Sequence, residues 1–379
     1  MFTLSDQQRA ISDTATRFGA EHLTPFALQW EQDRHLPVEV LREAGRLKMG
    51  GLHVGPDVGG QALSRVDAAL VVEGVATGCP AIAGCLSNHN TAAWMIDTYG
   101  DRGQRYRWLP GLCALTELAV YCIAEAGTGS DVAGVRATAA RDGDHYVISG
   151  VKNFVPAAGS ADVYIVIART AQSGTHGLSA FVIDRDDAGL SFGAGQVDVG
   201  WNARPTGQVV LNGVRVTADR RLGAEGDGFR VATSAVNGGR LHLAACSLGG
   251  AKAALNRSFA QLRGRSTTAG ILLLAAAVQL QLADMTTELE AARTLLWRAA
   301  ATLDAANPDA DRLCAMAKIL ATDAGSAVTD RALQLHRGAA DSGDGGIDQI
   351  ARDLELHRTI EGSNDLLRVL VARTMTGAG

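Results

Sequence analysis

The spacing of apolar residues changes twice along the chain, and this constrains the fold more than any other feature of the sequence. From Ser5 to Pro110 apolar residues recur at the three- and four-residue spacing of amphipathic helices. From about Leu118 to Gly228 they alternate with polar residues, as in HYVISGVKNFV and ADVYIVIART, between turns rich in Gly, Asp and Asn. After Phe229 the helical spacing returns. The sequence therefore predicts an α+β protein.

Three domains follow from these changes of period. We expect an N-terminal helical domain over residues 1–117, an antiparallel, β-barrel-like domain over 118–228 and a C-terminal four-helix bundle over 229–379. Long helices with apolar faces usually pack as such a bundle, and a bundle can also pair with copies of itself. The helical stretches that predict it lie around residues 240–261, 275–305, 312–337 and 363–374.

Composition argues against several classes of partner. The net charge of −5 and the lack of a Lys/Arg-rich run favour neither nucleic acid nor an anionic membrane. No segment approaches the roughly 20 apolar residues of a membrane span, and the first residues do not resemble a signal peptide, so we expect a cytoplasmic protein. The six cysteines are scattered and no His has metal-ligand spacing, which predicts reduced core thiols and no metal site.

Two segments of the middle region have features of a ligand site. In YCIAEAGTGSD, Gly127 and Gly129 precede Ser130, so backbone can approach a large planar or phosphorylated ligand and a hydroxyl can donate to phosphate. Gly-Thr-Gly-Ser is also an ordinary turn. In GVKNFVPAAGS a strand ends with Phe154 and Pro156; an aromatic residue at such a strand end more often belongs to the core.

A third segment, RDLELHRTIEGSNDLLRVLVART, carries an acidic residue on a helix break. Glu361 interrupts the helical spacing and is followed by Gly362 and by Ser363 and Asn364, a capping pair that starts a new helix at about Asp365. A carboxylate on such a break is either a solvated surface group or a functional group held at the end of two helices.

The three segments occur in the order and spacing of the acyl-CoA dehydrogenase family, which the chain resembles over essentially its whole length. Family members read approximately YCxTEPGxGSD, KxWITNG, GR and RDxxxxxIxEGTNEIxR. The counterparts here are residues 121–131, 152–159, 239–240 and 352–368. The segments SNHNTAAWMID, VGWN, VNGGR and EGSN are most similar to the isobutyryl-CoA dehydrogenases.

The resemblance implies an α,β-dehydrogenation. A base removes the α-proton of an acyl thioester, on CoA or a carrier protein, while the β-hydrogen leaves as hydride to FAD; Glu361 matches that base. It further implies that the backbone N–H of this Glu and a flavin ribityl hydroxyl stabilise the enolate. Burial should raise the pKa of Glu361. A homotetramer, built as a dimer of dimers, is also implied.

The resemblance assigns further residues to substrate and cofactor. Arg240 matches a position near the pantetheine arm, with Asn237 one turn before it, and the aliphatic Ile360 is compatible with a short branched acyl group. The residues matching substrate contacts are Ser130, Asn237, Arg240, Ile360, Gly362 and Ser363. Those matching FAD contacts are Ile123, Ala124, Gly129, Ser130, Phe154, Pro156, Arg265, Gln334, Gly338, Ser363 and Asp365.

The sequence departs from the family pattern mainly at the flavin. Ala124 and Pro156 stand where the family has hydroxyl side chains, and proline also lacks a backbone N–H. Phe154 replaces a stacking Trp. Residues 265–269 and 337–341 replace motifs that reach the dinucleotide of a neighbouring subunit. Each lost hydrogen bond costs on the order of 1 kcal/mol, so these departures predict weakened FAD binding.

Two alternatives to dehydrogenation therefore remain open in the sequence. One is redox-neutral chemistry on the α-carbanion, such as cyclisation or elimination on a thioester, which keeps Glu361 as the base. The other is a non-catalytic subunit of a hetero-oligomer. The electron acceptor is not predicted.

Overall fold

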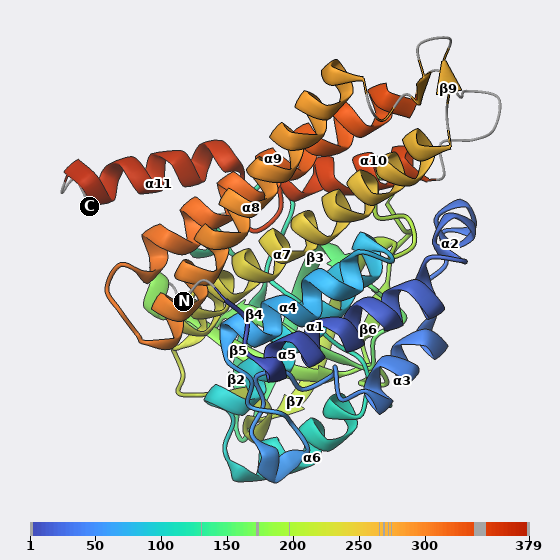
Figure 1. The fold of residues 1–379 in the computed structure, drawn as a ribbon. Coiled ribbons are helices and arrows are strands. Elements are labelled where there is room, and N and C mark those ends of the chain that lie inside the picture. The colour runs from blue at the N-terminus through green and yellow to red at the C-terminus, as the bar shows by residue number, and fades with distance from the viewer. Residues whose placement is uncertain are drawn as a thin grey trace.

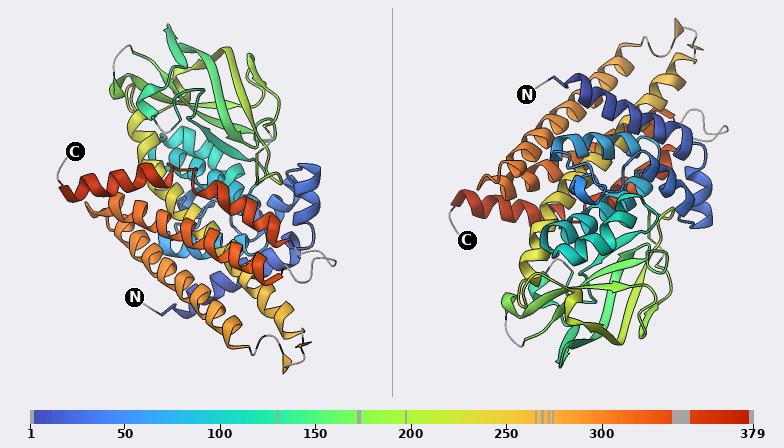
Figure 2. Two further views of the ribbon diagram at one scale, coloured as in Figure 1. Left: turned by 90° about the horizontal axis from the view of Figure 1, so that it is seen from above. Right: turned by 90° about the horizontal axis from the view of Figure 1, so that it is seen from below.

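The computed structural model describes residues 3–129, 131–171, 174–196, 198–264, 266, 267, 270, 271, 273, 275–336 and 346–376. Helices from the two ends of the chain lie against one another, and the middle of the chain forms a β-sheet on one side of them (Figures 1 and 2). The order of helices, strands and helices is the predicted one, and the mixed α+β class is confirmed.

The N-terminal helices begin at recognisable caps. Ser5 and Gln8 form a capping box at the start of α1, and Asp101 and Gln104 form another at the start of α6. These helices are α1 (Asp6–Phe18), α2 (Ala27–Asp33), α3 (Val38–Arg46), α4 (Arg65–Ala76), α5 (Pro80–Tyr99) and α6 (Arg102–Cys113).

The sheet is mostly antiparallel, in the order β6-β7-β3-β2-β4-β5-β8. The expectation of a wholly antiparallel domain was wrong at β4, because β1 pairs parallel with β4 and β2 meets β4 in a short parallel pairing. A parallel pair needs a long crossover, and β2 and β3 lie in the connection between β1 and β4. The strands are β1 (Ala119–Cys122), β2 (Thr138–Asp142), β3 (His145–Pro156), β4 (Val163–Arg169), β5 (Leu178–Asp184), β6 (Leu190–Phe192), β7 (Thr206–Thr217) and β8 (Arg221–Leu222).

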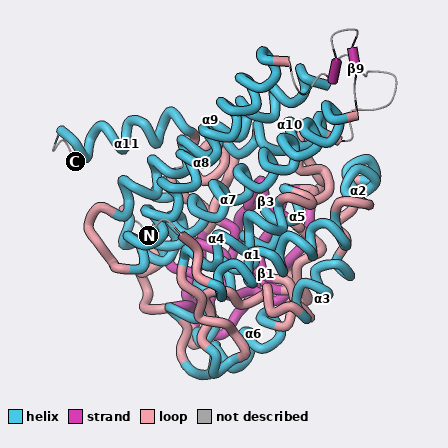
Figure 3. Tube along the Cα trace, in the orientation of Figure 1, coloured by secondary structure: helices cyan, strands magenta, loops and turns pink. Residues whose placement is uncertain are grey.

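The C-terminal helices include three long ones that pack together, α7, α8 and α9, and two shorter ones, α10 and α11 (Figure 3). In both views of Figure 2, α11 projects from the body of the protein. The elements are α7 (Gly228–Arg263), β9 (Ser266–Thr267), β10 (Gly270–Ile271), α8 (Ala276–Asp304), α9 (Ala310–His336), α10 (Ile347–His357) and α11 (Asn364–Thr376).

Helix α7 begins at Gly228, well before the predicted stretch 240–261. The sequence places the start of this helical stretch at about Arg240, whereas Gly238 and Gly239 lie inside α7. A Cβ at Gly239 would lie 2.8 Å from the carboxyl carbon of Glu361. Close packing, and not a helix end, therefore accounts for glycine here.

Helix α5 is buried along most of its length, between β1 and α7. Its polar residues therefore need internal partners. His89 Nε2 lies 3.1 Å from the Gly50 carbonyl oxygen and 3.0 Å from that of Leu112, while the Ala119 N–H donates to Nδ1. Because a carbonyl only accepts, Nε2 carries the proton and the imidazole is neutral.

Neutral buried imidazoles should make the fold sensitive to acid. Burial lowers the pKa of His89 to about 4, so below pH 6.5 the unfolded chain binds a proton that the folded chain does not. This stability is present above pH 6.5 and is lost as the pH falls toward 4. His89→Gln removes the effect. In urea titrations, the loss of unfolding free energy between pH 7 and pH 5 should be about 2 kcal/mol smaller in the variant. Equal losses in the two proteins would contradict this.

The six cysteines are all buried and unpaired. Burial raises the pKa of Cys79, Cys122 and Cys246 to about 12, so these thiols are inert near neutral pH. Among the residues that the structure describes, no His, Cys, Asp and Glu side chains cluster as metal ligands would, and no helix is long and apolar enough for a membrane span.

Candidate active site

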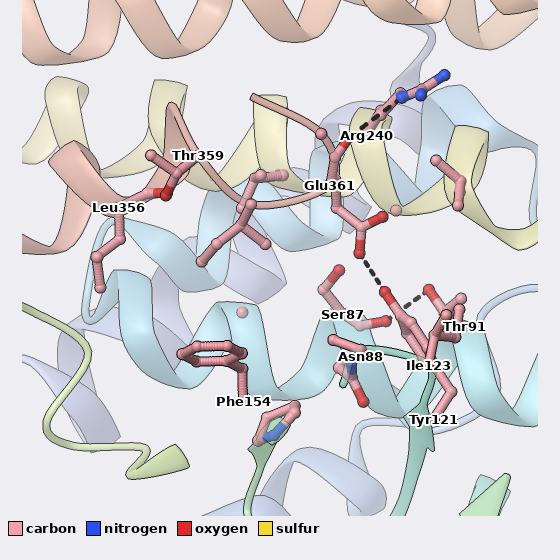
Figure 4. A pocket seen from close by; sticks show the side chains of 18 of the residues that line it. Ser87, Asn88, Thr91, Tyr121, Ile123, Phe154, Arg240, Leu356, Thr359 and Glu361 are labelled. Atoms are coloured by element: carbon pink, nitrogen blue, oxygen red, sulfur yellow. Dashed lines mark hydrogen bonds between the residues drawn. The ribbon is translucent and has the colours of Figure 1, made fainter. Parts of the chain in front are cut away.

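A cavity of about 720 Å³ lies where α5, α7, the ends of β1 and β3, and the turn after α10 meet (Figure 4). It brings together residues from all three predicted segments. The predicted site residues that line it are Ile123, Ala124, Gly129, Phe154, Pro156, Asn237, Arg240, Ile360, Glu361 and Gly362.

Glu361 lies in the turn between α10 and α11, and its carboxylate points into the cavity (Figure 4). Its φ of 56° is in the left-handed region, and Gly362 follows with φ 90°. A non-glycine residue there costs on the order of 1 kcal/mol, and such strain persists only where the surrounding structure holds it. The carboxylate packs directly against Gly239 on α7. Any side chain at position 239 would collide with it, so glycine leaves the room that the carboxylate needs.

Polar groups surround Glu361 on two sides. The Tyr121 hydroxyl donates to Oε1 of the carboxylate, and Arg240 Nε donates to the Glu361 carbonyl oxygen at 3.3 Å. Arg240 Nη1 also donates to Asn237 Oδ1 at 3.0 Å, and the Asn237 amide donates to Asp311. Asn237 and Arg240 thus lie one turn apart on α7, as expected, and line the same cavity.

A buried lysine holds the turn that carries Glu361. Lys318, on α9, has no exposed surface. Its ammonium donates to the carbonyl oxygens of Arg358, at 3.2 Å, and Gly362, at 2.8 Å, and to Asn364 Oδ1 at 2.8 Å. It therefore binds the turn on both sides of the Glu. Its role was not evident from the sequence, because a Lys in a long Ala-rich helix is usually solvated.

Burial and the neighbouring polar groups shift the pKa of Glu361 in opposite directions. Burial raises the pKa of Glu361, while the Tyr121 hydrogen bond and the charges of Arg240 and Lys318 lower it; the net shift is upward. The predicted upward shift is confirmed. Burial also lowers the pKa of Lys318 to about 7. Glu361 is therefore more basic than an exposed Glu, and the Tyr121 hydrogen bond fixes the position of its carboxylate. Both properties suit a general base.

Five of the residues expected at the flavin line the cavity: Ile123, Ala124, Gly129, Phe154 and Pro156. Phe154 is 59% exposed, and its φ of 56° lies at an irregularity where β3 leaves its register with β7. Ile123 and Ala124 follow β1 directly. A Cβ on Gly129 would meet nothing within 4 Å, so this loop leaves open space. An exposed aromatic face beside open backbone suits a planar ligand, although Ala124 and Pro156 contribute no hydroxyl.

A buried ion pair joins the first two predicted segments. Lys152 Nζ lies 2.7 Å from a Glu125 carboxylate oxygen and also donates to the Ile123 carbonyl oxygen at 3.2 Å. Glu125 in turn accepts from the backbone N–H groups of Arg136 and Ala137. The pair fixes the end of β1 against β3, which places the flavin-side residues of both segments together.

The loop before β7 contributes Trp201 and Arg204 to the cavity wall. The Trp201 indole N–H donates to His357 Nε2 at 3.0 Å, its backbone N–H donates to Asp353, and the absence of a side chain at Gly84 leaves room for its ring. The Arg204 guanidinium lies 4.1 Å from the Trp201 ring centroid. It is 3% exposed and its Nε has no hydrogen-bond partner.

Several predicted residues do not line this cavity. Ser363 turns its hydroxyl to the start of α11, where it accepts from a backbone N–H, and Asp365 pairs with a nearby Arg on the surface of the same helix. Gln334 donates along α9 to an Asp one turn away. Ser130, Arg265 and Gly338 lie outside the described residues.

The cavity also contains residues that the sequence analysis did not assign. They include Ser87, Asn88, Thr91, Tyr121, Trp201 and Arg204. The run SNHNT lies in the middle of an otherwise apolar helix. A polar run inside a buried helix signals internal partners or a cavity, but burial of α5 was not evident from its spacing alone.

Models of three protein-family domains match almost the whole chain. They are acyl-CoA dehydrogenase N-terminal domain over residues 5–116, middle domain over 120–214 and C-terminal domain over 226–376. The chain is 39% identical to the mitochondrial isobutyryl-CoA dehydrogenase of Bos taurus over 98% of its own length and 89% of the relative's. It is also 39% identical to that of Dictyostelium discoideum, over 98% and 90%.

The structure of butyryl-CoA dehydrogenase from Megasphaera elsdenii superposes with a TM-score of 0.94 and 28% identity, covering 99% of this chain and 100% of that one. The chain therefore belongs to the acyl-CoA dehydrogenase family, a family of FAD-dependent oxidoreductases.

The residues present fit the family cofactor by shape more than by side-chain hydrogen bonds. Phe154 offers an exposed ring face, and Gly129 leaves space beside the backbone of Ile123 and Ala124. FAD, when bound, supplies the hydride acceptor of the reaction.

Proposed function

We propose that this chain is an acyl-CoA dehydrogenase for a short branched acyl thioester, with Glu361 as the base that removes the α-proton. The observation that carries the proposal is the Glu361 carboxylate in a cavity, with raised pKa, between Tyr121 and Arg240. The isobutyryl-CoA dehydrogenases, at 39% identity, support the substrate class.

In the proposed reaction the α-carbon proton passes to a Glu361 carboxylate oxygen, while the β-carbon loses hydride and a C=C bond forms. The backbone N–H of Glu361 stabilises the negative charge that develops on the thioester oxygen. Arg240 and Asn237 hold the thioester arm at the α7 side. Phe154 would offer its exposed ring face to the cofactor and help to exclude water.

The aliphatic residues of the cavity wall support a small substrate. Leu243, Leu356 and Ile360 line the cavity, and Ile360 precedes the base directly. Branched aliphatic side chains at this position narrow the space beside the α-carbon. We therefore retain a short branched acyl group as the proposal, on either CoA or a carrier protein.

The test is the visible absorption spectrum of the purified protein with added FAD. Stoichiometric flavin that bleaches on addition of isobutyryl-CoA is the expected result, because reduction of FAD abolishes its absorption near 450 nm. Absence of bound flavin at excess FAD would overturn the proposal. That result would instead point to the redox-neutral alternative, although both relatives named above are dehydrogenases.

Three further parts of the proposal concern the setting of the enzyme. We propose a homotetramer, supported by exposed apolar residues along the projecting α11: Leu366, Val369 and Met375. The cytoplasmic location and the domain limits at 117/118 and 228/229 remain predictions.

A further inference from the structure

Arg204 places a buried positive charge in the wall of the cavity. The residue lies in the loop before β7 and is almost fully buried. In the part of the chain that the structure describes, no carboxylate forms an ion pair with it, and no acceptor takes a hydrogen bond from its guanidinium. Proteins rarely bury a charge without a partner, because desolvation of an unpaired ion is costly. This cation therefore suits an anionic group that enters the cavity.

The terminal nitrogens of Arg204 are open to the cavity. One face of the guanidinium lies over the Trp201 ring, 4.1 Å from its centroid, and both residues line the cavity. Nε is fully buried, whereas the two Nη atoms, which also make no hydrogen bond to the described residues, keep accessible surface. An arginine with a stacked face and an open edge can bind a carboxylate through two parallel hydrogen bonds.

Neighbouring groups of the chain compensate this charge only in part. Burial lowers the pKa of Arg204 overall, although Asp198 and two buried thiols are among the groups that oppose the shift. The thiols, Cys85 and Cys246, are neutral near pH 7, because burial raises their pKa to about 11 and about 12. Asp198 accepts from the Thr206 hydroxyl at 2.7 Å and forms no ion pair with Arg204. The charge therefore remains available to a ligand.

Tyr121 links the position of Arg204 to that of the base. Its hydroxyl donates to the Glu361 carboxylate, and the Arg204 charge opposes the rise in its pKa that burial chiefly causes. The charges that lower the pKa of Glu361 are instead those of Arg240 and Lys318. Arg204 thus lies near the base without being its partner. An acyl chain that has its α-carbon at Glu361 and extends past Tyr121 approaches Arg204.

We propose that the acyl group of the substrate ends in a carboxylate, remote from the thioester, and that Arg204 binds this carboxylate. The inference rests on the proposed function and narrows its substrate class to short branched acyl groups with an anionic end. A methyl-terminated chain would cover the guanidinium with apolar atoms and leave it unpaired. A cationic chain would be repelled, since like charges are poorly screened in a buried site.

The experiment compares 2-methylbutanoyl-CoA with the 2-methylsuccinyl-CoA whose methyl branch is next to the thioester. The two differ only at the chain end, where a carboxylate replaces a methyl group. With the FAD-loaded protein and an artificial electron acceptor, we expect kcat/KM to be at least about tenfold higher for the carboxylated thioester. Hydrogen bonds between charged groups are worth about that factor or more.

Arg204→Met removes the charge at nearly constant side-chain length. The preference should reverse, because the carboxylate then lacks its partner and the methyl group no longer meets a buried cation. Comparison between variants cancels the intrinsic difference in reactivity between the two thioesters. Arg215→Met is the matched control. Arg215 pairs with Asp142 on the surface of β7 and does not line the cavity, so this variant should keep the wild-type preference.

Arg204→Lys provides a second variant if Arg204→Met fails to fold. It keeps the charge but loses the paired donors, so it should reduce the preference several-fold. Flavin content and melting temperature report folding for both. An unchanged preference in a folded Arg204 variant, or no preference in the wild type, overturns this inference alone. Faster turnover of 2-methylbutanoyl-CoA on addition of acetate also overturns it, because a separate anion would then occupy the position. No flavin bleaching by isobutyryl-CoA or by either test thioester overturns the proposed function instead.

Discussion

Replacing Glu361 with Gln should lower kcat about a thousandfold while leaving FAD content unchanged. The amide keeps the size of the side chain and an oxygen that accepts from Tyr121, but it has no basic lone pair to take the α-proton. General bases contribute 10²- to 10⁴-fold to rate, which sets the expected range. Stopped-flow reduction of the flavin by substrate measures the step directly.

The matched control is Glu355→Gln, in the last turn of α10. Glu355 pairs with Arg358 on the surface and does not line the cavity. Its rate of flavin reduction should stay within twofold of wild type. A Glu361→Gln enzyme that reduces flavin at the wild-type rate would remove Glu361 from the mechanism.

Lys318→Met should destabilise the fold by about 3 kcal/mol. Methionine matches the length of the lysine stem, but the carbonyl oxygens of Arg358 and Gly362 and the Asn364 side chain then lose a donor in a buried place. Urea unfolding measures the change. Lys252→Met, on a partly exposed position of α7, is the control and should shift stability by less than about 0.5 kcal/mol.

Two pH measurements separate the charge of Lys318 from its packing. The pKa of Lys318 falls from 10.5 to about 7 in the folded protein. Between pH 7 and pH 10.5 the unfolded chain therefore binds a proton at this lysine that the folded chain does not. Stability relative to Lys318→Met should therefore rise with pH over this window, by up to about 1.4 kcal/mol per unit.

The second measurement is the pH profile of kcat/KM. Because the Lys318 charge lowers the pKa of Glu361, removing it should move the acidic limb to higher pH. An unmoved limb would mean that Lys318 acts on the turn through its hydrogen bonds alone.

Local sequence patterns predicted the parts of the site that depend on the chain near each residue. The break at Glu361, the cap that follows it and the one-turn spacing of Asn237 and Arg240 are all short-range features. The change of period gave the order of the elements, because periodicity reports which face is buried.

The remaining parts depend on contacts between distant segments, which no local pattern contains. The parallel pairing of β1 with β4 and the role of Lys318 both join residues far apart in sequence. Gly239 resembled a helix start because glycine serves both helix ends and close packing.

Helix α11 starts three residues after the base and buries only Asn364 and Leu367 among its described residues. The helix is therefore held near its start, where Arg368 also pairs with Asp323 of α9, and it is largely exposed toward its C-terminal end. In the proposed homotetramer, a neighbouring subunit bound to α11 would contact the segment that begins three residues after the base. If that contact stabilises the turn of Glu361, linkage requires a bound thioester to strengthen subunit association by the same factor.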